Sequence, residues 1–198
     1  MNRTQALHLL HEYITNPALI RHSLAVEAAM RFYAQKAGAD VEQWGLAGLL
    51  HDFDYERWPE PPDHTRQGAA VLRAAGVDED VVAAILSHAD WNLADYPRDT
   101  PLRRTLFAVD ELCGFIYAVA LMRPERLAGL GPSSVKKKLK SKGFAAAVSR
   151  DDIDQGAALL GLPLEEHIQN CVDAMATIAA SLDLAPPADS PTGAQPAP

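Results

Sequence analysis

The sequence contains a series of histidines and aspartates whose types and placement suit metal binding. The most informative is Asp110, whose own helical face holds Leu106, Cys113, Gly114 and Tyr117. Burying an ionised carboxylate on such a face costs on the order of several kcal/mol unless a cation or hydrogen-bond donors compensate it. A metal ion would supply that compensation, and a buried Arg or Lys is the alternative. The candidate metal ligands, in chain order, are His22, His51, Asp52, His64, His88 and Asp110.

The positions of the histidines support this hypothesis. His51 and Asp52 stand where a very apolar helix gives way to a loop, and at a frayed helix end both side chains can reach one ion. His64 and His88 each lie at a helix edge beside a loop. Such a position combines a rigid scaffold with access to solvent, which a functional site needs. His22 taken alone fits a hydrogen-bonded core histidine, and only its combination with the other residues favours a ligand.

The ligand types also indicate which metals to expect. Imidazole and carboxylate together suit Mn, Fe, Co, Ni or Zn better than Mg or Ca, which prefer all-oxygen shells. Four histidines and two aspartates can hold two ions. The sequence therefore predicts a divalent metal cofactor, with two ions expected and Mg less favoured.

The elements that must position these residues are all helices. Capping residues, prolines at first helical positions and closing glycines divide the chain into helical segments, and no convincing strand pattern appears in the sequence. The stretches 54–63 and 90–99 are expected to be loops, and 123–143 to hold short helices. The sequence thus predicts an all-α fold. The expected long helices cover residues 4–14, 17–38, 41–51, 64–75, 79–88, 101–122, 150–161 and 164–184.

The composition is that of one globular domain. The chain has 198 residues, of which 48% are apolar, and this excludes disorder of the whole chain and allows a sizeable core. We expect one domain over residues 1–184 and a disordered Pro/Ala-rich tail over residues 185–198. Cys113 and Cys171 lie in apolar helical segments, which favours free buried thiols over a disulfide.

Charge and segment length exclude several classes of partner. The chain carries 18 Lys and Arg against 26 Asp and Glu, a formal charge of −8, which argues against binding to a nucleic-acid polymer. No apolar stretch reaches the roughly 20 residues that a membrane span needs, and the first residues lack a signal-peptide pattern. We therefore expect a cytoplasmic protein without membrane contact. The apolar last helices allow a homodimer.

The order of these residues resembles the signature of the HD superfamily of metal-dependent phosphohydrolases, and the two extra histidines resemble its two-metal members. The resemblance covers roughly residues 4–182 and implies a helical HD-domain bundle with a C-terminal helical extension. It further implies that His22, His51, Asp52 and Asp110 bind one ion. The resemblance also implies that Asp52 bridges to a second ion, which His64 and His88 bind.

Three functions fit this resemblance. The first is metal-assisted hydrolysis of a phosphate ester, acting on a small phosphorylated or nucleotide substrate as a phosphomonoesterase or phosphodiesterase. The second is oxygenation, because the same ligand order resembles di-iron HD oxygenases that act on a small polyol or phosphonate. The third, a regulatory or binding module, is less favoured because all six ligand positions hold competent residues.

Further residues are candidates for catalysis and substrate binding. Asp52 is expected to act at the metal, and Asp54 and Glu56, just after it, could donate a proton to the leaving group or be solvated loop carboxylates. Lysine runs such as 136–142 are mostly solvated faces, although they could also attract phosphate. The candidate cations for the substrate phosphate are Arg21, Arg66, Lys136 and Lys137.

Overall fold

The computed structural model describes residues 1–187, and its regular elements are helices. Within these residues there is no strand, so the all-α prediction is confirmed. The α-helices are α1 (Arg3–Tyr13), α2 (Pro17–Ala37), α3 (Val41–Leu50), α4 (Asp63–Ala74), α5 (Glu79–His88), α6 (Pro101–Leu121), α7 (Pro132–Leu139), α8 (Arg150–Leu160) and α9 (Leu164–Ala176), with a 3-10 helix η1 at Asp90–Asn92.

Local sequence explains where the two longest helices begin and end. The Asn16 side chain caps α2 by accepting a hydrogen bond from the Ala18 amide at 2.9 Å, and Pro17 takes the first helical position. α2 ends at Gly38, whose φ of 63° closes the helix at little steric cost. α6 repeats the arrangement with Thr100 as its cap and Pro101 at its start.

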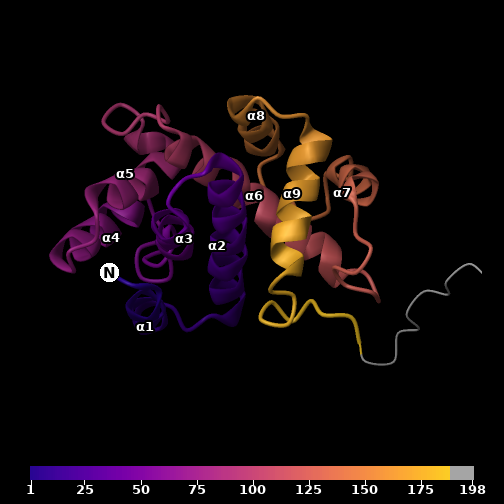
Figure 1. Cartoon of the computed structure of the whole chain (residues 1–198), viewed down its shortest axis with the longest axis horizontal. Coiled ribbons are helices and arrows are strands. Elements are labelled where there is room, and N and C mark those ends of the chain that lie inside the picture. The colour runs from indigo at the N-terminus through magenta and orange to yellow at the C-terminus, as the bar shows by residue number, and fades with distance from the viewer. Residues whose placement is uncertain (188–198) are drawn as a thin grey trace, which may run out of the picture.

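The helices form two groups joined by α2 and α6. In Figure 1, α1, α3, α4 and α5 lie on one side of α2, whereas α7, α8 and α9 lie on the other. α6 packs against α2, α5, α8 and α9 and so connects the groups. The core contains fully buried Phe53, Leu106, Phe115 and Ile116. These contacts hold the middle of α6, where Asp110 lies, against α2.

α2 and α3 approach closely at Gly48. A Cβ atom added there would lie 2.9 Å from the Glu27 Cα atom, which is backbone and cannot move aside easily. Glu27 is 3% exposed, and its carboxylate accepts hydrogen bonds from Arg3 (2.6 Å) and Arg31 (2.8 Å), so its charge is compensated. The close crossing places the end of α3 beside the first turns of α2.

The structure differs from the sequence prediction at the C-terminal end. α9 ends at Ala176, not near residue 184, and residues 177–183 form tight turns in which several amides bond three residues back. The turns bring Leu182 and Leu184 into the core, both fully buried, and the Leu127 amide donates to the Leu184 carbonyl. Burial of these two leucines therefore outweighs continuation of the helix.

Three other sequence predictions concern the cysteines, membrane spans and the C-terminal tail. Cys113 and Cys171 are free and buried, as expected. Over residues 1–187 no helix combines the length and hydrophobicity needed to cross a membrane. The predicted tail, 185–198, lies outside the described residues from 188 onward.

Candidate metal centre

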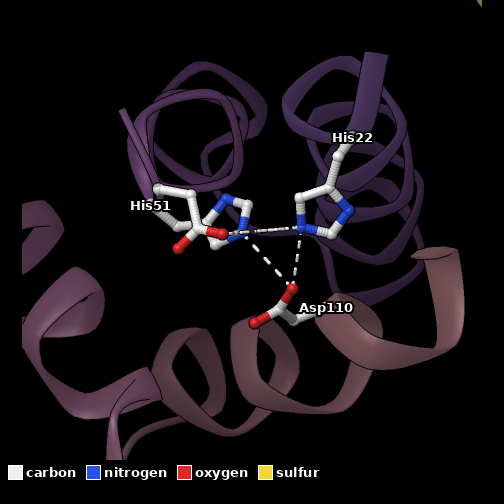
Figure 2. A group of neighbouring side chains, drawn as sticks. His22, His51 and Asp110 are labelled. Carbon is white, nitrogen blue, oxygen red and sulfur yellow. Dashed lines mark hydrogen bonds and ion pairs between the residues drawn. The ribbon is translucent and has the colours of Figure 1, made fainter. Parts of the chain in front are cut away.

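Four side chains, from α2, from α6 and from the turn that directly follows α3, converge at one point between these helices. Figure 2 shows His22 from α2, His51 at the end of α3 and Asp110 from α6 directed at one another. The Nε2 atoms of His22 and His51 are 3.1 Å apart, and Asp110 Oδ1 lies 3.0 and 3.3 Å from them. Asp52 Oδ2 lies 3.4 Å from His51 Nε2 and 3.8 Å from His22 Nε2. These four atoms form a group that could hold a metal ion.

A second group meets the first at Asp52. Its other oxygen, Oδ1, lies 3.3 Å from His64 Nε2 and 3.3 Å from His88 Nε2, which come from α4 and α5. These three residues could also hold an ion. The two oxygens of one carboxylate thus face two different sets of imidazole nitrogens. The structure therefore brings together all six residues that the sequence singled out as ligands.

Backbone carbonyls orient two of the imidazole rings. Nδ1 of His51 lies 2.8 Å from the Gly48 carbonyl, and Nδ1 of His88 lies 2.6 Å from the Ile85 carbonyl. A carbonyl only accepts, so each Nδ1 donates its proton and leaves the Nε2 lone pair free to bind a metal. This fits the donor chemistry of a transition-metal ion.

The Asp54 carboxylate orients a third imidazole ring, that of His64. Its Oδ1 lies 2.9 Å from His64 Nδ1, and its Oδ2 accepts the amides of Thr65 and Gly68, each at 2.9 Å. Thr65 has a left-handed φ of 69°, which kinks α4 and turns both amides toward the carboxylate. Gly68 is required by the close approach, since a Cβ there would lie 2.6 Å from Asp54 Oδ2.

Charge compensation strongly perturbs the pKa values of the cluster. Burial disfavours the charged form of His51, yet the carboxylates of Asp52 and Asp110 raise its pKa well above its usual range. Burial opposes ionisation of Asp110, but His51 and His22 hold its pKa below its usual range. For His64, burial is again outweighed, here by hydrogen bonds to Asp52 and Asp54, and its pKa rises to about 9. Protons therefore compete with a metal ion for these atoms.

The two groups open into one cavity of about 470 Å³. Asp52 and Asp110 are about one fifth exposed, whereas the His51 side chain is fully buried beneath them. Both carboxylates thus have one open side toward the cavity. Apart from the ligands, its lining residues are Leu19, Tyr55, Ala89, Asp90, Trp91, Phe107, Glu111, Gly114, Val148 and Asp152.

The expected proton donors do not line this cavity. Asp54 is 1% exposed and its two oxygens are occupied by His64 and the two amides, so it positions a ligand and is not placed to protonate a leaving group. Glu56 turns away to the start of α2, where it accepts bonds from the Thr15 hydroxyl (2.6 Å) and the Asn16 amide (3.0 Å). The structure thus brings neither carboxylate to the cavity where it was expected to donate a proton.

The expected phosphate-binding cations are also elsewhere. Arg21 forms an ion pair with Asp183, and Arg66 donates through Nε to Asn92 at 2.9 Å. Lys136 pairs with Glu165, and Lys137 lies beside it at a separate hollow on α7. Arg21 directly precedes His22 and Arg66 follows His64 by two residues, yet neither lines the cavity, because side chains one or two residues apart on a helix do not face each other.

Sequence reasoning missed the acidic wall residues of the cavity, Asp90, Glu111 and Asp152, and of these Glu111 has the clearly shifted pKa. Glu111 follows Asp110 on α6 and accepts the Ser149 amide at 3.1 Å. Burial, with the nearby Asp110 charge, raises its pKa to about 7. Its position beside a buried aspartate on a largely apolar helix was the available signal.

Comparison with known proteins supports this reading of the site. The model of the HD domain family matches residues 19–114. That range includes all six residues of the two groups. No solved structure matches the chain significantly.

Proposed function

Residues 19–114 match the HD domain family, whose members are generally metal-dependent hydrolases, and from this premise we propose that the chain hydrolyses phosphate esters of small molecules. The observation that carries the proposal is the Asp52 carboxylate, whose two oxygens lie 3.3–3.4 Å from imidazole nitrogens of two different groups. Divalent ions held by these residues would lower the pKa of bound water to about 7 and polarise a phosphoryl oxygen, and so would supply a nucleophile and stabilise charge.

The residues of the chain prepare the site before any ion binds. His51, His64 and His88 are each held by a hydrogen bond at Nδ1, so that little reorganisation is needed at Nε2. Asp110 closes the first group from α6. Four side chains would hold an ion at the first position and three would hold one at the second, with Asp52 belonging to both groups.

The volume of the cavity and the net charge of the chain support a small substrate. A cavity of about 470 Å³ is of the size that takes a small molecule, and the net charge of −8 disfavours a nucleic-acid polymer. The partner proposed here is therefore a small phosphorylated compound.

The test of this function is turnover with defined metals. Protein loaded with Mn²⁺ or Co²⁺ is expected to release nitrophenol from p-nitrophenyl phosphate or from its diester, and a chelator is expected to stop the reaction. Failure to hydrolyse a broad panel of phosphate esters, by folded protein with both metal positions filled, would overturn the proposal.

One observation favours a second candidate, a di-iron oxygenase acting on a small polyol or phosphonate. Among the residues described, no Lys or Arg lines the cavity, and a neutral polyol needs none. The two candidates separate by metal and co-substrate: iron as purified with substrate-dependent oxygen uptake supports the oxygenase, whereas phosphate release under anaerobic conditions supports the hydrolase.

A further inference from the structure

We propose that Glu111 and Asp152 bind a cationic amine on the substrate, so that the preferred substrate is a phosphate ester whose alcohol carries an ammonium group. The inference rests on the proposed function, since it takes the phosphate to lie at the metal ligands. It concerns the wall of the same cavity, and it names the part of the substrate that does not react.

The charged groups on that wall, other than the ligands, are all acidic in the part of the chain described. Besides Glu111 and Asp152 the wall has Asp90, which pairs with Arg98 at 2.7 Å and is thereby neutralised. Glu111 accepts only the Ser149 amide among the hydrogen bonds of residues 1–187, and no side-chain cation of those residues pairs with it or with Asp152.

Packing of α8 on α6 brings Glu111 and Asp152 to the wall of the same cavity. Gly156 of α8 lies so close to α6 that an added Cβ would meet the Ala108 Cα atom at 2.7 Å. The first turn of α8 therefore lies over Glu111. There the Ser149 amide donates to Glu111, and the Asp152 amide donates to the Ser149 hydroxyl at 3.2 Å.

When both carboxylates are ionised, a charge balance over the cavity leaves them uncompensated. At most two divalent ions would bring four positive charges, of which Asp52 and Asp110 cancel two. The dianion of a phosphate monoester cancels the rest. The N-terminus of α8 contributes about half a positive charge, which is less than two carboxylates need. A cation on the substrate supplies the missing charge.

The remaining wall is compatible with such a cation. Tyr55 and Trp91, each 40% exposed, flank His64 with ring centroids 5.1 and 5.9 Å from its own. Both line the cavity. Aromatic faces attract organic cations and carry no charge that would repel one.

Binding of two isosteric ligands tests the inference without turnover. Calorimetry on the metal-loaded protein would compare 2-aminoethylphosphonate with propylphosphonate, in which a methyl group replaces the ammonium group. We expect the ammonium ligand to bind at least about tenfold more tightly, because hydrogen bonds between charged groups are worth that much or more. Equal affinity of the two ligands would overturn the proposal.

Substitutions of the two carboxylates test whether they cause the preference for the ammonium ligand. Glu111→Gln and Asp152→Asn keep the shape of each side chain, and each should lower the preference for the ammonium ligand about tenfold while metal content stays unchanged. Asp151→Asn is the matched control, since Asp151 lies in the same helical turn but is exposed and outside the cavity. Loss of affinity for both ligands to the same degree would contradict the proposed role.

Kinetics then separates this inference from the function on which it rests. Phosphoethanolamine and propyl phosphate form the corresponding substrate pair. Hydrolysis of both with equal kcat/KM would support the hydrolase and overturn the amine site. Selective binding of the ammonium ligand with no hydrolysis of either ester would support the amine site and overturn the hydrolase.

Discussion

Asp54 and His64 form a buried pair in which Oδ1 of the carboxylate lies 2.9 Å from Nδ1 of the ring. The same carboxylate accepts two backbone amides through Oδ2, at Thr65 and Gly68. One side chain thus fixes both the kink of α4 and the tautomer of a ligand. Asp54 acts through His64 and does not face the cavity.

We expect Asp54→Asn to weaken the second metal position. Its amide NH₂ would face either the His64 N–H or the two backbone N–H groups, and loss of such an outer hydrogen bond costs about 10–100-fold in metal affinity or activity. Metal titration and kcat would measure it. Glu56→Gln is the control, because Glu56 is exposed and outside the cavity, and its effect on kcat should stay within about twofold. Equal losses in the two variants would contradict the positioning role of Asp54.

The number of ions bound should depend on which ligand is removed. Elemental analysis of wild-type protein is expected to find about two divalent ions per chain, the number that the two donor groups can hold. His64→Ala should leave about one ion, because the first group remains complete. Asp52→Ala should lose most of both, since Asp52 belongs to both groups. Retention of two ions in the Asp52 variant would show that the carboxylate does not bridge.

The lysines of α7 should not contribute to turnover. Lys136 and Lys137 line a separate hollow and do not line the cavity of the metal centre, and Lys136 is paired with Glu165. The double variant Lys136→Ala, Lys137→Ala is expected to change kcat/KM by less than about twofold. A tenfold loss in kcat/KM, with unchanged metal content, would instead place these lysines on the path of the substrate.

Much of the site was predictable because local signals carry it. Asp110 is an acid on an apolar helical face, and His51 and Asp52 stand at a helix end, so each could be recognised from its neighbours. Helix starts such as Pro17 and Pro101 were similarly marked by caps. The structure confirms the helices and brings the six residues together. Metal binding by these six residues remains a prediction, and the elemental analysis proposed above would test it.

The remainder depends on contacts between distant segments. In the sequence, Asp54 resembles a free loop carboxylate. Its role becomes visible only in the structure, where the left-handed Thr65 turns the backbone of α4 toward it. Glu111 joins the cavity only because α8, some forty residues later, packs over it. The end of α9 likewise depends on burial of Leu184 against residues of another segment. Such relationships have no periodic or capping signal in the sequence.

Gly48→Ala tests whether the close approach of α2 and α3 supports the centre. The added Cβ would lie 2.9 Å from the Glu27 Cα atom, and forcing apart packed backbones costs about 1–3 kcal/mol or more in free energy of unfolding. Chemical denaturation would measure the loss, and metal titration should show weaker binding because His51 shifts away from His22. Gly143→Ala is the matched control, since an added Cβ there meets nothing within 4 Å. If Gly48→Ala were as stable as the control, the crossing of the two helices would not be tightly packed.

Metal binding should stabilise the folded protein through the same six residues. An ion that binds only the native state at 100 times its dissociation constant adds about 2.7 kcal/mol. For a chain of this size each kcal/mol raises Tm by about 2–4 °C, so chelated protein should gain about 5–10 °C for each metal position that is filled when Mn²⁺ is restored. Differential scanning calorimetry would measure the shift. Asp52→Ala should show little of it, because this variant lacks the carboxylate shared by both groups. A shift of equal size in the variant would mean that Mn²⁺ stabilises the fold by binding elsewhere.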